Sequence, residues 1–201
     1  MKKWLSIGLL ALGLSLFGHG VYMQAKAWLA QVLIEQAWQT TLKSPNKKIK
    51  PWFYADSYPV AQIIWPKHNK RLTVLDGASG RNLAFAPSHF LPAGELGGAD
   101  FGNSQGALIA GHNDTHFAFL KNAKVGEQFS LQLKNGQVQH YSVTHVEVIN
   151  QYNTDFLQQS GLYLLTCYPF DSLASGTDLR WLVSAEISSP EVELGISTTS
   201  S

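Results

Sequence analysis

Short apolar runs separated by turn residues dominate the chain after residue 50, and this pattern constrains the fold more than any other feature. Branched and aromatic residues form the runs, and glycine, proline and Asp-Gly or Asn-Gly pairs stand between them. Asn135-Gly136 separates two alternating runs, and such a pair is the strongest short-range signal of a β-hairpin. Roughly six to eight short strands with almost no helix predict a barrel or a sandwich.

The expected elements follow from these runs and their turns. Strands are predicted at 59–65, 71–75, 82–85, 107–110, 127–133, 138–149, 162–166 and 180–185. Short helical turns are predicted at 115–120 and 155–160. A long glycine-rich loop is expected over 88–102.

The N-terminus has the pattern of a membrane segment. Lys2 and Lys3 precede a run without charged residues from Trp4 to Met23, which reaches the length of a bilayer core. The small-x-small sequence at 25–27 is also compatible with a cleaved signal peptide. We favour an uncleaved anchor because the run exceeds a usual signal core, and the two lysines then place the N-terminus in the cytoplasm.

Four segments are expected along the chain. They are a membrane anchor at 1–24, an amphipathic stalk helix with a linker at 25–50, a folded domain at 51–190 and a disordered tail at 191–201. Apolar residues recur at helical spacing from Trp28 to Trp38. This apolar face is expected to lie either on lipid or on the folded domain.

Composition narrows the classes of function. The formal net charge is +1 and the lysines form no stripe, which disfavours nucleic-acid binding. The single cysteine excludes an internal disulfide. No phosphate-binding glycine motif occurs, and His112 and His116 lack an evident third ligand, so neither a cofactor nor a metal is indicated.

Cys167 is the candidate nucleophile. It ends the apolar run 162–166 and is followed by Pro169, which predicts a thiol at the end of a strand. A thiol with an ordinary pKa near 8.5 needs a neighbouring base. His112 follows the run 107–110, and Arg180 opens the next apolar run. If these strands are neighbours, the arrangement predicts acyl transfer through a thioester, with His112 moving protons and Arg180 stabilising an oxyanion.

Each candidate has a plain structural alternative. A lone cysteine is often a small buried hydrophobe. His116 competes for the role of base, although the preferred histidine ends its strand more directly. Arg180 has Asp171 and Asp178 as alternative surface partners.

The three motifs in this order resemble the sortases, which are cysteine transpeptidases. The resemblance is carried by A-G-H-N-D-T-H-F around His112, L-L-T-C-Y-P around Cys167 and R-W-L-V from Arg180, and it extends over about 51–187. The Gly-His-Asn-Asp-Thr-His-Phe and Thr-Cys-Tyr-Pro-Phe segments are most similar to the sortases of Gram-negative bacteria.

The resemblance implies a closed eight-stranded β-barrel and a peptidase-class activity, hydrolase or acyltransferase. The implied substrate is an exported protein with an LPxTG-like C-terminal signal, which is joined to an amine acceptor. It also implies that Thr166 lines the substrate channel. Asn113 and Asp114 are expected to orient the histidine loop. The enzyme would be a single-pass protein of the inner membrane, with its catalytic domain facing the periplasm or the outside.

Three other functions remain compatible with these residues. Water as the final acceptor would make the same site a cysteine peptidase. A membrane-tethered barrel that only binds a partner would leave Cys167 inert. A redox sensor is the third, although it would lack a partner cysteine.

Overall fold

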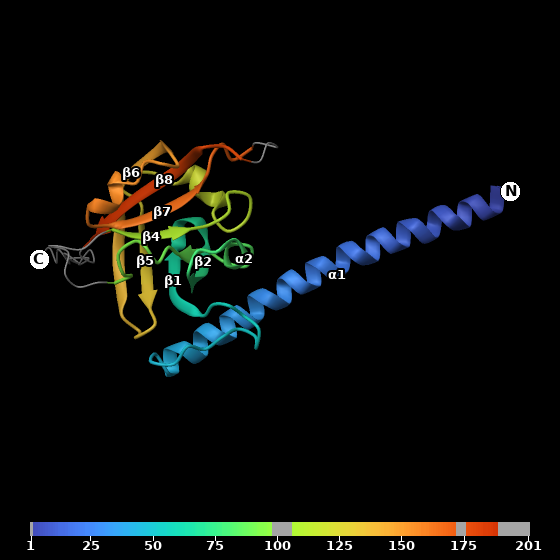
Figure 1. The fold of residues 1–201 in the computed structure, drawn as a ribbon, viewed down its shortest axis with the longest axis horizontal. Coiled ribbons are helices and arrows are strands. Elements are labelled where there is room, and N and C mark those ends of the chain that lie inside the picture. Colours follow the sequence, from blue (N-terminus) through green and yellow to red (C-terminus); the bar gives the residue numbers. More distant parts are fainter. Residues whose placement is uncertain (1, 98–105, 172–175, 189–201) are drawn as a thin grey trace, which may run out of the picture.

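The computed structural model describes residues 2–97, 106–171 and 176–188, and within them a long N-terminal helix stands beside a closed barrel of eight strands (Figure 1). The elements are α1 Lys2–Lys43, β1 Pro59–Trp65, η1 Pro66–His68, β2 Lys70–Asp76, α2 Gly80–Leu83, β3 Ser88–His89, β4 Ala107–Ala110, η2 Ala118–Asn122, β5 Gln128–Leu133, β6 Val138–Asn150, η3 Asp155–Gln158, β7 Leu162–Cys167 and β8 Leu179–Ile187.

The barrel closes in the order β1-β2-β3-β4-β7-β8-β6-β5. Two neighbouring pairs, β2 with β3 and β4 with β7, are parallel, and the other pairs are antiparallel. The predicted eight-stranded barrel is therefore confirmed. The predicted tail at 191–201 and most of the glycine-rich part of the predicted loop lie outside the described residues.

Inward-facing side chains fill the barrel because strands alternate their two faces. Ile63 and Trp65 of β1 and Leu164 of β7 are fully buried. The ring of Trp65 stacks on Phe129 of β5, with centroids 4.5 Å apart. The walls that carry the candidate site are thus held by a continuous aromatic and aliphatic core.

Two sequence predictions about the segment between β2 and β4 were wrong. Residues 82–85 do not form a strand, because Ser79 accepts a hydrogen bond from the Asn82 amide at 3.2 Å and caps the short helix α2 instead. Within the predicted loop, β3 pairs with both β2 and β4 and closes the sheet between them. A two-residue strand carries no periodicity, so its sequence gives no signal.

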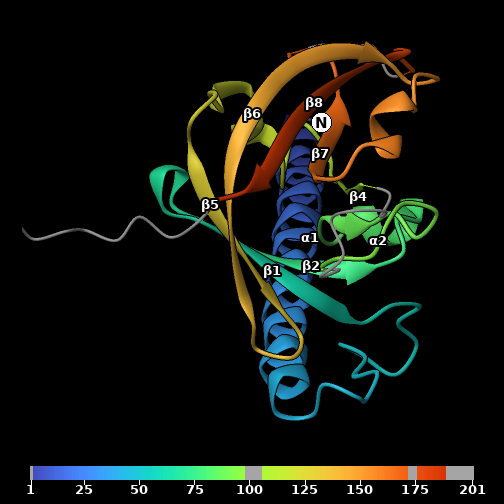
Figure 2. The ribbon, with the colours of Figure 1, turned by 90° about the vertical axis from the view of Figure 1, so that its left-hand side faces the viewer.

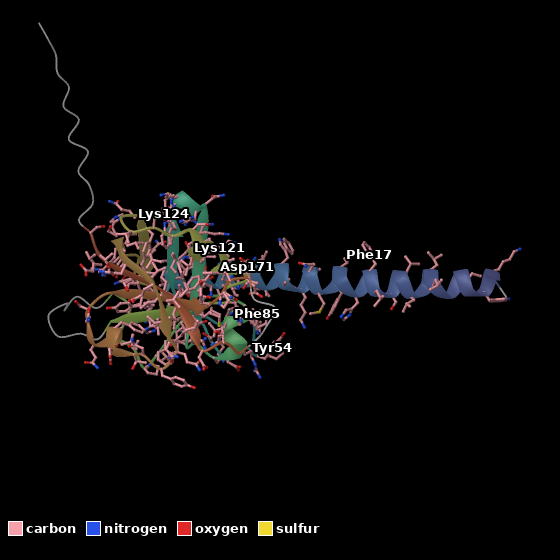
Figure 3. The ribbon with its side chains drawn as sticks, turned by 90° about the horizontal axis from the view of Figure 1, so that it is seen from above. Phe17, Tyr54, Phe85, Lys121, Lys124 and Asp171 are labelled. Carbon is pink, nitrogen blue, oxygen red and sulfur yellow. The ribbon has the colours of Figure 1, made fainter. Side chains whose placement is uncertain are left out.

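Helix α1 has two differently used halves. Its N-terminal half projects away from the barrel, as Figure 3 shows at Phe17, and the helix is long and apolar enough to cross a membrane. From Ala30 onward α1 packs on β1 and β2 (Figure 2). Its buried residues there recur at helical spacing: Ala30, Ile34, Ala37, Trp38 and Thr41.

The contact face of the stalk differs partly from the predicted one. Trp28 is 68% exposed, whereas Ile34, which lies between the predicted contacts, is buried on the barrel. Polar residues of the predicted outer side also bind the barrel. The Glu35 carboxylate accepts hydrogen bonds from Gln62 at 3.1 Å and Thr73 at 3.2 Å. The last turns of α1 are therefore part of the packed domain.

Candidate active site

Strands β4 and β7 place the candidate base beside the candidate nucleophile. They run parallel in a register that pairs Ala110 with Leu165, and the Gly111 amide extends the ladder by donating to the Leu165 carbonyl at 3.1 Å. Continuing this register by two positions brings His112 alongside Cys167. Adjacent strands lie about 4.8 Å apart, so both residues leave the sheet at the same edge.

Strand β8 brings the third candidate to the same place. The antiparallel register pairs Cys167 of β7 directly with Arg180 of β8. Residues directly opposite each other project on the same face, with Cβ atoms about 4.5–5.5 Å apart. Cys167 lies on the outer face of the barrel wall, because Leu164 points into the core and Leu165 packs outside it. Its thiol is free and half-buried.

Gly111 makes the position of His112 possible. A Cβ atom at Gly111 would lie 2.8 Å from the ring of Phe117, which is fully buried. The Phe117 amide in turn donates to the His112 carbonyl at 3.0 Å and closes the loop that follows β4. The glycine thus lets a core aromatic pack under the histidine loop, while the His112 side chain stays exposed.

Two side-chain hydrogen bonds lock the His112 segment to the Cys167 segment. The Thr166 hydroxyl donates to the Gly111 carbonyl at 2.7 Å, and this side chain is only 3% exposed. Further along each segment, the side-chain amide of Asn113 donates to the Pro169 carbonyl at 3.1 Å. Asn113 therefore joins the histidine loop to the segment after Cys167, and its role in orienting that loop for catalysis stays a prediction. The Thr166 hydroxyl is engaged within the wall, so its contact with substrate stays a prediction.

His116 lies close enough to His112 to be influenced by its charge. Burial lowers the pKa of His116 below its ordinary value, and the charges of His112 and Lys70 lower it further. The Asp114 carboxylate acts in the opposite direction on the same pKa. His116 is thus disfavoured as a cation, while Asp114 remains exposed beside the pair. Whether Asp114 orients His112 stays a prediction.

Arg180 is held by groups on its own side of the site. Its guanidinium donates to the carbonyls of Thr177 at 2.6 Å and Leu179 at 2.8 Å, and to the side-chain oxygen of Gln151. Asp178 accepts from the same glutamine side chain at 2.6 Å. Gln151 therefore stands between the arginine and the carboxylate that the sequence offered as its alternative partner.

Three packed aromatic side chains fix the segment that follows Cys167. The ring of Tyr168 stacks on Trp181 with centroids 5.7 Å apart, and Phe170 meets the same indole edge-on. The Trp181 indole donates to the Leu120 carbonyl at 3.0 Å. The segments after the cysteine and after the histidine are consequently both anchored to β8.

An apolar outer surface continues from Cys167 along the barrel wall, and sequence reasoning did not find it. Its buried members come from β4, β6, β7, β8 and the segment before β4: Leu108, Ile149, Tyr163, Leu182 and Ala93. Phe156 and Leu157 of η3 pack on it. The available signal was β7 itself, which is apolar on both faces although an outer barrel face usually meets water.

These positions suit thiol chemistry on an extended acyl substrate. The edge joins a thiol, an imidazole and a guanidinium, which are the groups needed to attack a carbonyl, move a proton and stabilise an oxyanion. A closed barrel carrying these groups on β4, β7 and β8 defines a candidate thiol-dependent acyl-transfer site. Among the residues that the structure describes, no cluster of metal-ligating side chains occurs.

The chain belongs to the sortase family. The family model of the sortase domain matches residues 63–188, which include every candidate residue of the site. Sortases are cysteine transpeptidases. A comparison with curated protein sequences finds no match.

Solved sortase structures share the fold. Sortase A from Corynebacterium diphtheriae superimposes with a TM-score of 0.57 at 18% identity, covering 82% of this chain and 86% of that chain. Sortase C-1 from Streptococcus pneumoniae gives 0.54 at 26% identity, with coverages of 65% and 67%. Sortase A from Listeria monocytogenes gives 0.53 at 19% identity, with coverages of 65% and 88%. The likeness to these structures shows the shared fold.

Proposed function

We propose that this sortase cleaves an LPxTG-like C-terminal signal of an exported protein and transfers the new C-terminus to an amine, with Cys167, His112 and Arg180 as its catalytic residues. The single observation that supports the assignment best is the register of β4, β7 and β8. It brings His112 alongside Cys167 and places Arg180 directly opposite the cysteine.

The proposed reaction has two halves. The Cys167 thiolate attacks the carbonyl carbon of the signal's threonine and forms a carbon–sulfur bond. The carbon–nitrogen bond then breaks, and the departing glycine amine takes a proton from the His112 imidazolium. In the second half an incoming amine attacks the thioester, His112 accepts a proton from it, and the Cys167 thiolate leaves.

Arg180 has the role of stabilising the negative charge that develops on the carbonyl oxygen. A guanidinium stays charged at every working pH and offers a planar fork of donors. In this structure the fork is occupied by Gln151 and by two carbonyls. Substrate binding then requires at least one of these hydrogen bonds to be exchanged for a bond to the substrate.

Thr166 and Asn113 support the site from the protein side. Both connect the histidine segment to the cysteine segment by hydrogen bonds. We infer that Thr166 shapes the substrate channel through the strand end that it holds.

The membrane holds enzyme and substrate together in this proposal. Residues 1–24 form the anchor, 25–50 the stalk and linker, and 51–190 the catalytic barrel, with the tail at 191–201. Lys2 and Lys3 favour a cytoplasmic N-terminus in the inner membrane. Confinement of both proteins to one membrane raises their effective concentration. The motif segments around His112 and Cys167 support a place among the sortases of Gram-negative bacteria.

The test uses the full chain in detergent micelles with a quenched LPxTG-type peptide library. Cleavage is followed by mass spectrometry with and without an added amine, for the wild type and for Cys167→Ala, His112→Ala and Arg180→Ala. His145→Ala, at an exposed histidine on β6, is the matched control. We expect cleavage to require the three residues but not His145, and an amine-joined product to appear.

Other outcomes separate the competing functions. Hydrolysis with every amine tried would make the chain a cysteine peptidase. If no peptide is cleaved and Cys167 resists alkylation across pH, the transpeptidase proposal fails and the binding barrel replaces it.

A further inference from the structure

Large aromatic side chains are exposed where α1 leaves the barrel. Phe53 is 91% exposed, Trp28 68% and Tyr54 64%, and Leu29 beside Trp28 is also exposed. We call these four residues the collar. Phe53 and Tyr54 meet edge to face with centroids 4.8 Å apart. Exposed apolar residues that gather in one place mark an interaction site rather than ordinary surface.

The loop that carries Phe53 and Tyr54 returns to α1 near Lys26 and Leu29. A cavity of about 390 Å³ is lined by Lys26 and Leu29 of the helix and by Trp52, Tyr54 and Phe85 of the barrel. Tyr54 of the loop and Leu29 of the helix therefore border one recess, although they lie far apart in the sequence. Its lining is mainly apolar, with Lys26 at the helix and an Arg81–Asp56 ion pair at the other wall.

The position of the collar along α1 identifies what covers it. The charge-free run from Trp4 to Ala25, at about 1.5 Å per residue, is long enough to cross a hydrocarbon core of roughly 30 Å. Lys26 follows directly, and Ala30 is already buried on the barrel. Because α1 continues unbroken through this segment, only about 8 Å of helix separates the lipid-spanning run from the barrel. That is comparable to the depth of one headgroup layer.

We propose that the collar docks on the lipid bilayer, with Phe53, Tyr54 and Trp28 inserted at headgroup depth. The residue types fit, because tryptophan and tyrosine are enriched at membrane–water interfaces, where their rings bridge apolar and wet surroundings. Lys26 lies where its long side chain reaches the lipid phosphates. The apolar recess behind Tyr54 gives an acyl chain a place against Leu29 and Phe85.

Docking of the collar fixes the direction in which the candidate site faces. Figure 3 shows Asp171, which follows Cys167 by four positions, on the same side of the barrel as Tyr54 and Phe85, the side from which α1 departs. In Figure 1 the segment after β7 also lies on that side. The docked barrel thus presents the Cys167 end toward the membrane. This inference rests on the proposed anchor, and it predicts substrates whose cleavage point lies close to their own membrane segment.

Depth measurements on the full chain test the docking. In a Cys167→Ala background, a nitroxide is attached to Tyr54→Cys, Leu14→Cys or Val138→Cys, and each chain is placed singly in nanodiscs of phosphatidylcholine and phosphatidylglycerol. Leu14 lies on the exposed half of α1. Val138 is an exposed apolar residue of the β5–β6 hairpin, whose tip lies near the C-terminal end of α1 and far from its departing half (Figure 1). The observable is the ratio of oxygen to nickel-chelate collisions at each label.

We expect the ratio of oxygen to nickel-chelate collisions, which is higher for a label deeper in lipid, to be highest at Leu14, intermediate at Tyr54 and lowest at Val138. The value at Tyr54 should be several-fold above that at Val138. Adding Phe53→Ser to the Tyr54 chain should move that label toward the value of Val138. Equal values at Tyr54 and Val138, with Leu14 deep in lipid, overturn the docking and leave the anchor standing. A Tyr54 label shielded from both reagents, in detergent as well as in lipid, means that protein covers the collar and also overturns it.

The remaining outcomes keep the two proposals apart. A Leu14 label in water removes the anchor, and the docking with it. Cleavage by the wild-type chain is measured in the same nanodiscs. A Tyr54 label in lipid without any cleavage supports the docking and contradicts the catalytic proposal. Cleavage with the Tyr54 label in water supports the catalytic proposal and contradicts the docking.

Discussion

The contacts between the Cys167 and His112 segments differ in kind from the contacts that hold Arg180. Three hydrogen bonds join the first two segments: from the buried Thr166 hydroxyl to the Gly111 carbonyl, from the Gly111 amide to the Leu165 carbonyl, and from the Asn113 side chain to the Pro169 carbonyl. The guanidinium of Arg180 is held by carbonyls of neighbouring residues and by one glutamine, in a partly exposed position. The difference indicates that the barrel fixes the Cys167 and His112 segments relative to each other, whereas the Arg180 guanidinium is held by local contacts only. The proposed function requires the guanidinium to exchange one of these contacts for the substrate.

The largest effect is expected from breaking the support under His112. In Gly111→Ala the new methyl group meets the Phe117 ring, and overpacking of this kind costs about 1–3 kcal/mol of unfolding free energy. The histidine loop has to shift, and a misplacement of about 1 Å lowers catalysis on the order of 100-fold. Thermal unfolding and kcat/KM for a cleaved peptide measure both effects.

Gly80→Ala is the matched control for this substitution, because nothing lies within 4 Å of its Cβ position. Gly80→Ala should leave both the unfolding temperature and kcat/KM nearly unchanged. Normal kcat/KM in Gly111→Ala would show that the packing under the loop does not set the position of His112.

The second-largest effect is expected from removing the buried hydrogen bond between the Thr166 hydroxyl and the Gly111 carbonyl. Thr166→Val keeps the side-chain shape but leaves the Gly111 carbonyl without its donor, at a cost of about 1–3 kcal/mol in stability. We expect kcat/KM to fall about tenfold, which corresponds to about 1.4 kcal/mol in the transition state. Thr166→Ser restores the donor and should recover most of the activity. If the serine variant is as impaired as the valine variant, the methyl group rather than the hydroxyl carries the effect.

A smaller effect is expected on the arginine side. Gln151→Ala removes one partner of the Arg180 guanidinium and leaves its two carbonyl partners. Stability should stay within about 0.5 kcal/mol, as for other surface substitutions. KM for the peptide should fall modestly, because the guanidinium is freer to meet the substrate. A loss of kcat as large as that of Arg180→Ala would instead mean that Gln151 positions the arginine for catalysis.

The smallest effect concerns His116 and pH. Its pKa is lowered in the folded chain, chiefly by burial and then by His112, whereas an unfolded histidine titrates near pH 6.5. The unfolded chain therefore binds the proton more readily, and stability falls as pH drops from about 6.5 through the lowered pKa. Above pH 6.5 this contribution is fully present.

Denaturant unfolding across pH tests this contribution. His116→Gln should flatten the acid-side loss of stability, while His140→Gln, at an exposed histidine of β6, should not. His116→Gln should also leave cleavage nearly unchanged if His112 is the base. Loss of cleavage in His116→Gln would transfer the role of base to His116.

Local patterns were enough to predict most strands of the barrel. The predicted runs at 59–65 and 162–166 lie within β1 and β7, and the run at 127–133 begins one residue before β5, because alternation and Asn-Gly turns are local properties of the chain. The prediction of a strand at 82–85 was wrong because Ser79 caps a short helix there, and this cap stabilises the helix more than the short apolar sequence favours a strand. The strand β3 could not be found because its pairing partners are distant in sequence.

Sequence order alone marked Cys167, His112 and Arg180 as residues that belong together. It gave no register, so the direct pairing of Cys167 with Arg180 came only from the barrel. The clamp from Asn113 to Pro169 and the tether from Arg180 to Gln151 join residues far apart in the chain. The apolar outer surface and the collar likewise arise from segments that meet only after folding.

The sequence by itself determined a barrel or sandwich of short strands and an apolar N-terminal helix, because hydrophobic periodicity and turn residues are local properties of the chain. Its ordered motifs gave the resemblance to the sortases, and that resemblance implied the closed barrel. Only the tertiary structure decided how β4, β7 and β8 align at the candidate site, which face of α1 packs on β1 and β2, and that Tyr54 borders the same recess as Leu29. These features depend on contacts between distant segments, and their geometry exists only once the barrel has closed.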